Sequence, residues 1–390
     1  MNILHLATLR TTVNNQIKRG LLLLMMLCVL GVVSIQAQDG ALTIIRNNAA
    51  TAVKNQARTG TCWCFSTTSL IESECLRKGL PAIDLSEMFT VRNIYKEKAQ
   101  NYIRRQGATR FDEGGLGHDV IHAIAAYGAM PESAYSGLIG QATTHDHSQM
   151  VPALKNYLDS LLKLSPVPEN WLSGFTTIMD SYIGPPPATF EYNGHNYTPL
   201  SFAKEVLKFN PDDYAFFTSF THHPFYQSFI IEVPDNVSNG AYYNIPLTEL
   251  VNITKTAVQK GYTVMWDADV SNNGWLTSKG YAFSPAADSI PMAKDIDPDI
   301  PEKAYTQTYR QSLYEQLITQ DDHLMHITGM KKTAKGKYFF VVKNSWSQKA
   351  GPFGGYINVS EPYFAINTVT IIVPKAALDK DIKHKMLAVK

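Results

Sequence analysis

The sequence predicts an α+β fold in which helices occupy the first half of the chain and strands the second. Three observations support this prediction. Apolar residues in the first half recur at helical spacings of three and four. Short runs of β-branched and aromatic residues are concentrated beyond about residue 213. Between the two parts, the run Gly184-Pro185-Pro186-Pro187 breaks regular structure. Helices followed by strands are typical of the α+β class.

The length and composition describe a folded globular protein. The 390 residues are enough for one large domain or two smaller ones with a substantial core. Hydrophobic residues make up 45% of the chain and charged residues 18%, which argues against wholesale disorder. The formal net charge of +1 gives no reason to expect nucleic acid or an anionic membrane surface as a partner.

The first 37 residues are typical of a secretion signal. Lys18 and Arg19 precede an apolar run over residues 21–33, and Ala37 follows as a small residue. At ~1.5 Å per residue this run spans only about 20 Å, which is shorter than the ~30 Å hydrocarbon core of a membrane. We therefore expect cleavage after Ala37, export to the periplasm or the extracellular space, and no stable membrane association of the mature protein. The alternative is an uncleaved membrane anchor.

Helices are the main secondary structure predicted in the first half of the chain, after the signal. Residues 41–57 are expected to form an extended lead-in. A helix is predicted over 62–78, because basic residues occupy its last turn and Gly79 follows as a terminating residue. A glycine-rich loop is predicted at 112–117. Further helices are predicted over residues 85–98, 120–127 and 150–163.

The second half is expected to supply the sheet. A helix over 247–260 interrupts the strands, and the polar tail is expected to contain a short helix. Strands are predicted over residues 227–233, 262–267, 338–343, 356–359 and 366–373. The chain is accordingly divided into a signal peptide, a helical subdomain, a helical insertion, a β-rich subdomain and a C-terminal tail, over residues 1–37, 38–142, 143–212, 213–375 and 376–390.

The cysteines leave a free thiol to be explained. Removal of the signal leaves Cys62, Cys64 and Cys75, and an odd number in an exported protein argues against a disulfide framework. Cys64 and Cys75 share one helical stripe with Thr68 and Ile71, so we interpret them as small buried core residues. Cys62 precedes that stripe, at the expected helix N-terminus.

Cys62 has the position of a reactive thiolate. A helix N-terminus and an imidazolium partner can lower the pKa of a thiol by several units. His323 is the candidate partner, since an imidazole can hold the thiol's proton and later deliver it to a leaving amine. Asn344 can fix the tautomer of that ring, and Trp346 can shield their hydrogen bond from water. The side-chain amide of Gln56 and the backbone N–H of Cys62 would then hold a developing oxyanion.

Each of these residues has a structural alternative when it is taken alone. A cysteine at a helix start is more often a core residue, a histidine on a strand edge is usually structural, and Asn-Ser-Trp is usually a turn. Their joint occurrence in the order Gln, Cys, His, Asn favours chemistry. The segments His145-Asp146-His147 and His222-His223 do not complete a zinc-type ligand set, so we expect no metal and no other cofactor.

At these positions the chain resembles the papain-like cysteine peptidases. The resemblance implies the papain-like α+β fold, with an N-terminal helical subdomain that carries the nucleophile and a C-terminal β-rich subdomain that carries the histidine and the asparagine. It implies catalytic roles for Cys62, His323 and Asn344, an oxyanion-hole role for Gln56, a supporting role for Trp346, and substrate binding by Gly114 and Gly115. Three segments carry it: Thr59-Gly60-Thr61-Cys62-Trp63-Cys64-Phe65-Ser66, Asp322-His323-Leu324-Met325, and Lys343-Asn344-Ser345-Trp346.

Two departures narrow the resemblance to one branch of these peptidases. Thr59 stands where papain has a disulfide cysteine. His323 and Asn344 follow Cys62 by 261 and 282 residues, whereas spacings of about 130–150 residues are usual, so a large insertion separates them. The bleomycin hydrolase and aminopeptidase C branch resembles this chain at residues 185–190, 197–202, 222–225 and 264–270.

The resemblance to that branch implies an oligomeric state and a role for the C-terminal tail. Its members form hexamers whose active sites face an inner chamber, so a homohexamer is implied. Their C-terminal arm lies in the cleft, and its carboxylate holds the free amine of the substrate. Here residues 376–390 would be the arm, and Lys390 would bring an unfavourable cation beside the incoming ammonium unless its side chain turns away.

The sequence thus predicts an exported cysteine peptidase that acts on peptide substrates. We expect it to hydrolyse peptide bonds through a thioester at Cys62 and to remove N-terminal residues, as an aminopeptidase. A papain-like endopeptidase is the alternative among enzymes. A catalytically inactive peptide-binding module on the same scaffold is the alternative from another class.

Overall fold

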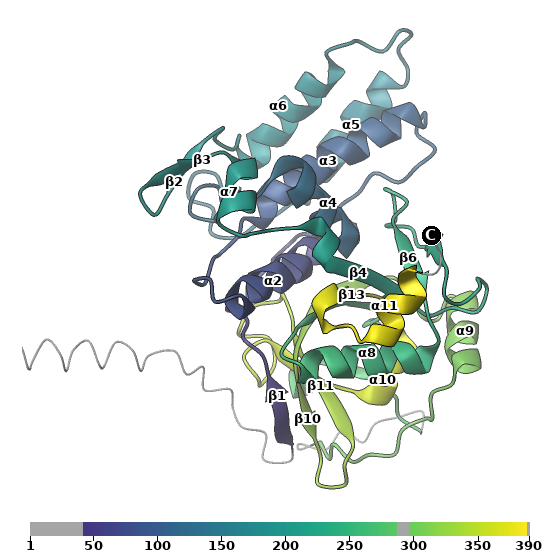
Figure 1. Cartoon of the computed structure of the whole chain (residues 1–390). Helices are drawn as coiled ribbons and strands as arrows, with labels where there is room; N and C mark the ends of the chain where they lie inside the picture. The colour runs from purple at the N-terminus through teal and green to yellow at the C-terminus, as the bar shows by residue number, and fades with distance from the viewer. Residues whose placement is uncertain (1–41, 287–295, 388–390) are drawn as a thin grey trace, which may run out of the picture. The chain divides into compact units, whose positions relative to one another are not determined.

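The computed structural model describes residues 42–286 and 296–387 (Figure 1). The described residues form one compact unit. The predicted signal peptide at 1–37 lies outside the described residues. None of the helices within the described ranges is both long enough and apolar enough to span a bilayer.

The helices of the described part are interleaved with short strands. The helices are α2 (Cys62–Arg77), α3 (Glu87–Arg104), α4 (Gly117–Tyr127), α5 (Met150–Leu161), α6 (Trp171–Ile183), α7 (Pro199–Glu205), α8 (Leu247–Gln259), α9 (Gln307–Glu315), α10 (Glu361–Asn367) and α11 (Lys380–Leu387). The strands are β1 (Thr43–Asn47), β2 (Phe190–Tyr192), β3 (His195–Tyr197), β4 (Tyr214–Thr218), β5 (Ser228–Ile230), β6 (Ala241–Asn244), β7 (Val264–Ala268), β8 (Trp275–Leu276), β9 (Tyr281–Ala282), β10 (His323–Lys332), β11 (Tyr338–Lys343), β12 (Tyr356–Ser360) and β13 (Thr368–Pro374).

One sheet contains all of these strands except the β2–β3 hairpin. Its order is β5-β6-β4-β13-β7-β10-β11-β12-β9-β8, and β1 pairs with β10. The ten-residue strand β10 is antiparallel to both of its neighbours, β7 and β11. Its first residue, His323, pairs with Ala268 of β7, and His326 pairs with Lys343 at the end of β11. This register brings the start of β10 close to Asn344, which directly follows β11.

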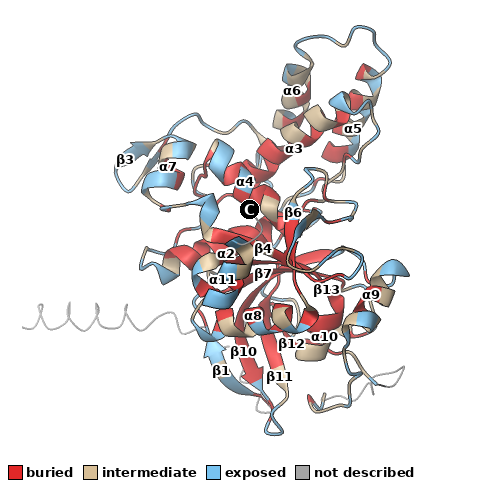
Figure 2. Ribbon diagram, turned by 45° about the vertical axis from the view of Figure 1, so that its right-hand side comes forward, coloured by how far each residue is buried: buried red, intermediate tan, exposed pale blue. Residues whose placement is uncertain are grey.

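Both faces of the central strands are buried. α2 packs on one face, and α8 and α10 cover the other (Figures 1 and 2). The alternation of side chains along β10 follows from this arrangement, because Leu324 joins the core around α2 whereas Met325 joins the core under α8. The start of β10 is therefore held between two packed layers.

α2 is buried along nearly its whole length, over residues 62–75. It lies between α3 and α4 on one side and β7 and β10 on the other. Cys64 and Cys75 are buried free thiols within this layer, as the sequence predicted. A helix surrounded in this way cannot tilt or shift without disturbing packing on both sides.

The insertion follows α4 and returns to the sheet at β4. It contains α5 and α6, the β2–β3 hairpin and α7. α5 and α6 pack against each other through buried residues, which include Leu154, Leu158, Phe175 and Met179. Figure 1 shows this pair beyond α3, away from the sheet.

The predicted order of helices and strands is confirmed, with corrections to individual elements. The helices expected at 62–78, 120–127, 150–163 and 247–260 correspond to α2, α4, α5 and α8. The expectation of a strand over 366–373 was wrong at its start, because α10 continues to Asn367 and packs with α8 before β13 begins. The expected helix at 85–98 corresponds to α3, which begins later, at Glu87, and extends to Arg104.

Candidate active site

The predicted nucleophile is the first residue of α2. The Cys62 side chain is buried, with 8% of its surface exposed. Thr61 is the N-cap, and its side chain makes no capping hydrogen bond. The backbone N–H of Cys62 has no acceptor within the described residues, and such first-turn N–H groups carry partial positive charge. This amide is therefore available to an anion that forms beside the sulfur.

The hydrogen bonds of Asn344 define the tautomer of His323. Asn344 Oδ1 accepts from the backbone N–H of Ser345 at 2.7 Å, so the atom in this position is an acceptor. The same oxygen lies 2.8 Å from His323 Nε2. Nε2 must therefore carry the proton and donate it to Asn344 Oδ1. In the neutral ring this leaves Nδ1 as the acceptor.

Trp346 lies across the histidine ring. The two ring centroids are 4.5 Å apart and the ring planes differ by 24°. The indole shields the bond between His323 and Asn344 from solvent. Shielding of this kind strengthens the hydrogen bond and holds the imidazole in one orientation.

A common cleft brings Cys62 and His323 together across 261 residues of sequence. Both residues line a cleft of about 570 Å³. Leu324, the residue after His323, donates a backbone hydrogen bond to the Cys62 sulfur. The start of α2 and the start of β10 therefore meet at the sulfur, as the predicted pairing of nucleophile and base requires.

Burial determines the protonation of the thiol. Removal from water raises the pKa of Cys62 to about 12. Leu324 opposes this rise through its hydrogen bond, whereas the nearby carboxylates of Asp321, Asp267 and Asp235 add to it. The sequence led us to expect a lowered thiol pKa. The structure differs because burial and the three carboxylates outweigh the helix N-terminus.

Burial also keeps the histidine neutral. It lowers the pKa of His323 to about 4, and the hydrogen bond that His323 donates to Asn344 and the charge of Asp322 offset only part of this effect. Burial thus favours the neutral form of both groups, and the nucleophile forms when the proton moves from sulfur to nitrogen.

Gln56 is connected to the loop that follows β11. Its backbone N–H donates to Ser345 O at 2.9 Å, and its Oε1 accepts from Ser345 Oγ at 2.5 Å. Its Nε2 donates one hydrogen to Thr59 O at 2.7 Å. An amide nitrogen has two hydrogens, so one remains for an oxyanion in the cleft that Gln56 lines.

The two predicted substrate-binding glycines differ in whether their backbone groups are free to bind a peptide. Gly114 O accepts from Lys98 Nζ at 2.6 Å, and Gly114 N donates to Asp112 Oδ1 at 3.2 Å. No hydrogen bond to a backbone group of Gly115 is found within the described residues. Trp63 packs beneath Gly115, where an added Cβ would lie 3.1 Å from the indole. Gly115 is therefore the better candidate to bind a peptide backbone.

Acidic residues of the cleft were not predicted as site residues. Asp112, Glu113, Asp235, Asp321 and Asp322 line it together with Arg110. Asp322 was noted only as the neighbour of His323. No local motif identifies the others, because the fold brings them together from separate segments.

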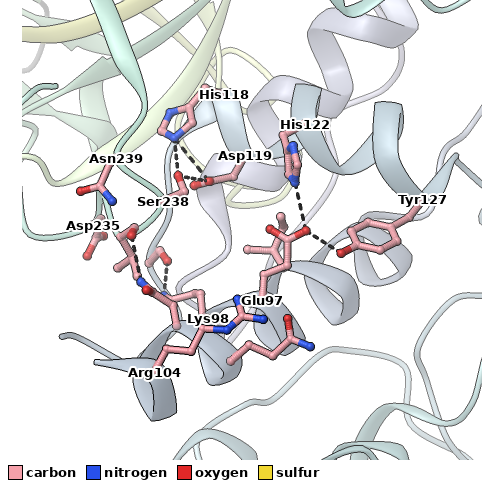
Figure 3. A pocket seen from close by; sticks show the side chains of 15 residues that line it. Glu97, Lys98, Arg104, His118, Asp119, His122, Tyr127, Asp235, Ser238 and Asn239 are labelled. Atoms are coloured by element: carbon pink, nitrogen blue, oxygen red, sulfur yellow. Dashed lines mark hydrogen bonds and ion pairs between the residues drawn. The ribbon is translucent and has the colours of Figure 1, made fainter. Parts of the chain in front are cut away.

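A second cavity lies between α3, α4 and residues 235–239 (Figure 3). Ser238 and His118 are 2.6 Å apart there, through Oγ and Nε2. This contact does not activate a nucleophile, because Ser238 Oγ donates to Asp119 Oδ1 at 2.6 Å and the other nitrogen of His118 lies 2.8 Å from Tyr242 OH. We interpret these contacts as the attachment of residues 235–239 to α4.

His222, His223 and Glu232 are the one group in the described residues whose atoms are close enough to share a metal ion. The hydrogen bonds of Gln311 argue against that use. Its Oε1 accepts from the backbone N–H of Thr221 at 2.6 Å, so its Nε2 must donate to His222 Nδ1 at 2.9 Å. His222 Nε2 then carries a proton, which it donates to Glu232, and a protonated nitrogen cannot bind a metal.

The described part of the tail lies outside the cleft. Lys385 of α11 pairs with Glu249 of α8 at 2.9 Å, and Ile382 is buried in the core under α8. No residue of α11 lines the cleft that contains Cys62. The expectation of an arm lying in the cleft is therefore wrong for Lys380–Leu387, because Ile382 and Met386 already pack in the core under α8.

Comparison with known proteins agrees with this geometry. A family model described as "Papain family cysteine protease" matches residues 43–135, which contain the cysteine. A model described as "Peptidase C1-like family" matches residues 96–388, which contain the histidine and the asparagine. The molecule is thus a cysteine-type peptidase of the papain-like class. More particularly, the chain belongs to the Peptidase C1-like family.

Individual relatives are distant but extend over most of the chain. Aminopeptidase W of Lactobacillus delbrueckii subsp. lactis is 24% identical over 85% of this chain and 82% of its own length. Aminopeptidase C of Listeria innocua is 23% identical over 85% of this chain and 81% of its own length. The crystal structure of PepW from Lactobacillus rhamnosis HN001 matches with a TM-score of 0.71 and 18% identity, over 89% of this chain and 85% of that one. This structural match confirms the predicted papain-like α+β fold.

Proposed function

We propose that this protein is a cysteine aminopeptidase that removes residues from the free N-terminus of peptides. The tautomer of His323 carries the proposal. Because Nε2–H donates to Asn344, Nδ1 is left as a proton acceptor in the cleft that contains the Cys62 sulfur. The names of the relatives, aminopeptidases W, G and C, support hydrolysis at the N-terminus.

Acylation begins with proton transfer within the pair. His323 Nδ1 takes the thiol proton while the Cys62 sulfur attacks the scissile carbonyl carbon, and the carbonyl electrons move onto oxygen. The backbone N–H of Cys62 and the second Nε2–H of Gln56 donate to that oxyanion, and loss of one such donor typically costs about 3 kcal/mol. The imidazolium then protonates the leaving amine as the C–N bond breaks, and a thioester remains.

Deacylation repeats these steps with water. His323 Nδ1 takes a proton from water as its oxygen attacks the thioester. The tetrahedral intermediate collapses, the C–S bond breaks, and the sulfur regains its proton from the imidazolium. Asn344 holds the same ring nitrogen through both steps, so the base returns to its starting tautomer.

A pair of peptides tests the proposal. The same peptide is supplied with a free and with an acetylated N-terminus, and the products are followed by mass spectrometry. We expect stepwise release of amino acids from the free form and no hydrolysis of the acetylated form. Cys62→Ala is expected to abolish turnover while the variant remains folded. Internal cuts in both peptides would instead identify an endopeptidase.

A thiol-directed epoxide separates an enzyme from a binding module. We expect the folded, reduced protein to be labelled at Cys62 in proportion to its loss of activity. Absence of labelling and of turnover would favour a peptide-binding module on this scaffold.

We further propose that the protein is exported, since a basic flank, a short apolar run and Ala37 are typical of a secretion signal. A mature N-terminus near residue 38 in the periplasmic or culture fraction is the expected result. The homohexamer that the branch resemblance implies stays a prediction, which the mass of the native particle measures.

A further inference from the structure

A small polar cavity borders Asn344 and is separate from the cleft that contains Cys62. Its volume is about 10 Å³, and Asn344, His326 and Ser69 line it, whereas none of these three lines the cleft. We propose that one water molecule occupies this cavity and joins His326 Nε2 to Asn344 Nδ2, which makes His326 a positioning residue for the peptidase reaction. The inference rests on the proposed function, since it concerns the asparagine that orients the catalytic histidine.

Two buried side-chain nitrogens at this cavity have no partner within the described residues. They are Asn344 Nδ2 and His326 Nε2, and the two residues are 3% and 0% exposed. A buried polar group is nearly always hydrogen-bonded, either to protein or to ordered water, because burial without a partner costs stability. Both nitrogens therefore require a partner that this cavity can hold.

Ser69 determines which nitrogen of His326 carries the ring proton. Its Oγ lies 2.7 Å from Lys343 Nζ and 2.9 Å from His326 Nδ1. An ammonium group only donates, so Ser69 Oγ accepts from Lys343, and no acceptor other than His326 Nδ1 is found for its own hydrogen within the described residues. Burial and the charge of Lys343 lower the pKa of His326 well below its usual value, so the ring is neutral. Nδ1 is therefore the acceptor, and Nε2 carries the proton.

The two unpaired nitrogens are thus both donors. Two donors cannot bond to each other, and neither can bind a cation, so their common partner must be an acceptor. A cavity of about 10 Å³ has room for a single water and for no polyatomic ligand. The oxygen of one water can accept from both N–H groups at once.

The wall of the cavity also offers acceptors for the two hydrogens of that water. Ser66 and Glu87 line it. Ser66 Oγ donates to Trp63 O at 3.2 Å and so keeps its lone pairs, and Glu87 presents a carboxyl group. A water here can therefore use both its lone pairs and both its hydrogens, as buried waters in proteins commonly do.

This water holds the end of Asn344 that faces away from the histidine. The other end is fixed already, because Oδ1 accepts from the backbone N–H of Ser345 and from His323 Nε2. With Nδ2 bonded as well, rotation of the amide breaks a hydrogen bond at each end. A reversed amide would present Nδ2 to the ring and select the tautomer of His323 with its proton on Nδ1. That tautomer cannot accept the thiol proton of Cys62.

His326 is itself held in place from two sides. It pairs with Lys343 across β10 and β11, next to Asn344. Ser69 bonds its Nδ1 from α2, the helix that begins with Cys62. The ring is thus fixed by a strand pair and a helix, as a group that positions a catalytic side chain requires.

The direct test is a crystal structure of the wild type at a resolution that shows ordered water. We expect one density peak within hydrogen-bonding distance of both His326 Nε2 and Asn344 Nδ2. A cavity without density, or a direct contact between the two side chains, would overturn the proposal. An anion identified there by its anomalous scattering would do the same.

Two substitutions of His326 in the full chain test its role in the reaction. Leucine removes both ring nitrogens, whereas glutamine has an amide that can accept from Ser69 and donate to the water. On alanyl 4-nitroanilide we expect His326→Leu to lose about tenfold in kcat, the effect of one buried hydrogen bond, with little change in KM. His326→Gln should keep most of kcat. Ile382→Ala removes a buried side chain from the core under α8, so it controls for lowered stability and should leave kcat unchanged in the folded protein.

The tautomer of His323 is a readout that lowered stability alone does not change. Nitrogen-15 NMR of histidine-labelled protein distinguishes the protonated from the unprotonated ring nitrogen, and His323→Gln assigns the resonance. We expect Nε2–H alone in the wild type, in His326→Gln and in Ile382→Ala, and a fraction of Nδ1–H in His326→Leu. A wild type that hydrolyses the anilide, with a His326→Leu variant that keeps both its kcat and its tautomer, would refute the positioning role alone. A folded wild type without turnover would instead refute the proposed function, while the crystal structure and the NMR spectrum still decide the water site.

Discussion

At the scale of residues, the position of one proton determines whether Cys62 reacts. Burial favours the neutral form of both the thiol and the imidazole. Asn344 accepts from Nε2, so Nδ1 is the ring nitrogen that can accept the thiol proton. The reaction therefore requires proton transfer from the Cys62 sulfur to His323 Nδ1.

This arrangement predicts the pH dependence of turnover. The pKa of His323 is lowered to about 4, so the imidazole is neutral above that pH and able to accept the thiol proton. As pH falls through about 4 the ring becomes protonated and the base is lost. We therefore expect kcat on a free-amine substrate to stay level from pH 7 down to about 5 and to fall with a midpoint near 4. A midpoint near 6.5, the value for a solvated histidine, would contradict this assignment.

The sequence predicted one kind of site residue and not the other. Cys62, His323 and Asn344 were recognisable because their chemistry requires particular side chains within short motifs. Asp235 and Asp321 line the same cleft but carry no such motif. They reach it from the loop between β5 and β6 and from the segment before β10, and no spacing along the sequence encodes that meeting.

At the scale of elements, buried polar contacts fix α2 against the strands that carry the base. Lys343 Nζ, at the end of β11, donates to Ser69 Oγ of α2 at 2.7 Å and to Thr51 Oγ1 at 3.0 Å. Ser69 Oγ in turn lies 2.9 Å from His326 Nδ1 of β10. These bonds join α2, β10 and β11 one turn or more from Cys62, and so determine how the sulfur faces the imidazole.

Lys343→Met tests this connection. The substitution keeps most of the side chain and removes a buried donor, so Thr51 Oγ1 and Ser69 Oγ each lose one hydrogen bond and α2 loses one tie to β11. We expect a loss of about 1–3 kcal/mol in the free energy of unfolding, measured by urea denaturation, together with a lower kcat in the folded variant. Lys335→Met is the matched control, since Lys335 is exposed and its one ion pair is 3.9 Å long. Equal midpoints for the two variants would exclude the connection.

The sequence predicted elements best where their own residues favour one structure. α2, α5 and α8 have clear apolar periodicity, and β11 and β12 are rich in β-branched and aromatic residues. β10 was missed because His323, Gly329 and its unbranched methionines are weak strand formers. Its strand conformation comes from pairing with β7 and β11. α6 was missed for a similar reason, since Gly174 and its threonines disfavour a helix that packing against α5 nevertheless stabilises.

At the scale of the whole molecule, the cleft is formed by two parts that need each other. The helical part supplies Cys62 and the glycine loop, and the sheet supplies His323 and Asn344. Residues 235–239 extend from the sheet side and attach to α3 and α4. This attachment joins the two sides of the cleft through the segment that carries Asp235.

The described part of the tail has a structural role. Ile382 of α11 is 4% exposed and packs in the core under α8, while Lys260 Nζ donates to Ala377 O at 2.9 Å. Ile382→Ala should therefore destabilise the fold by about 2–4 kcal/mol, measured by urea denaturation. The exposed neighbour Lys383 provides the control Lys383→Ala, which should change stability little.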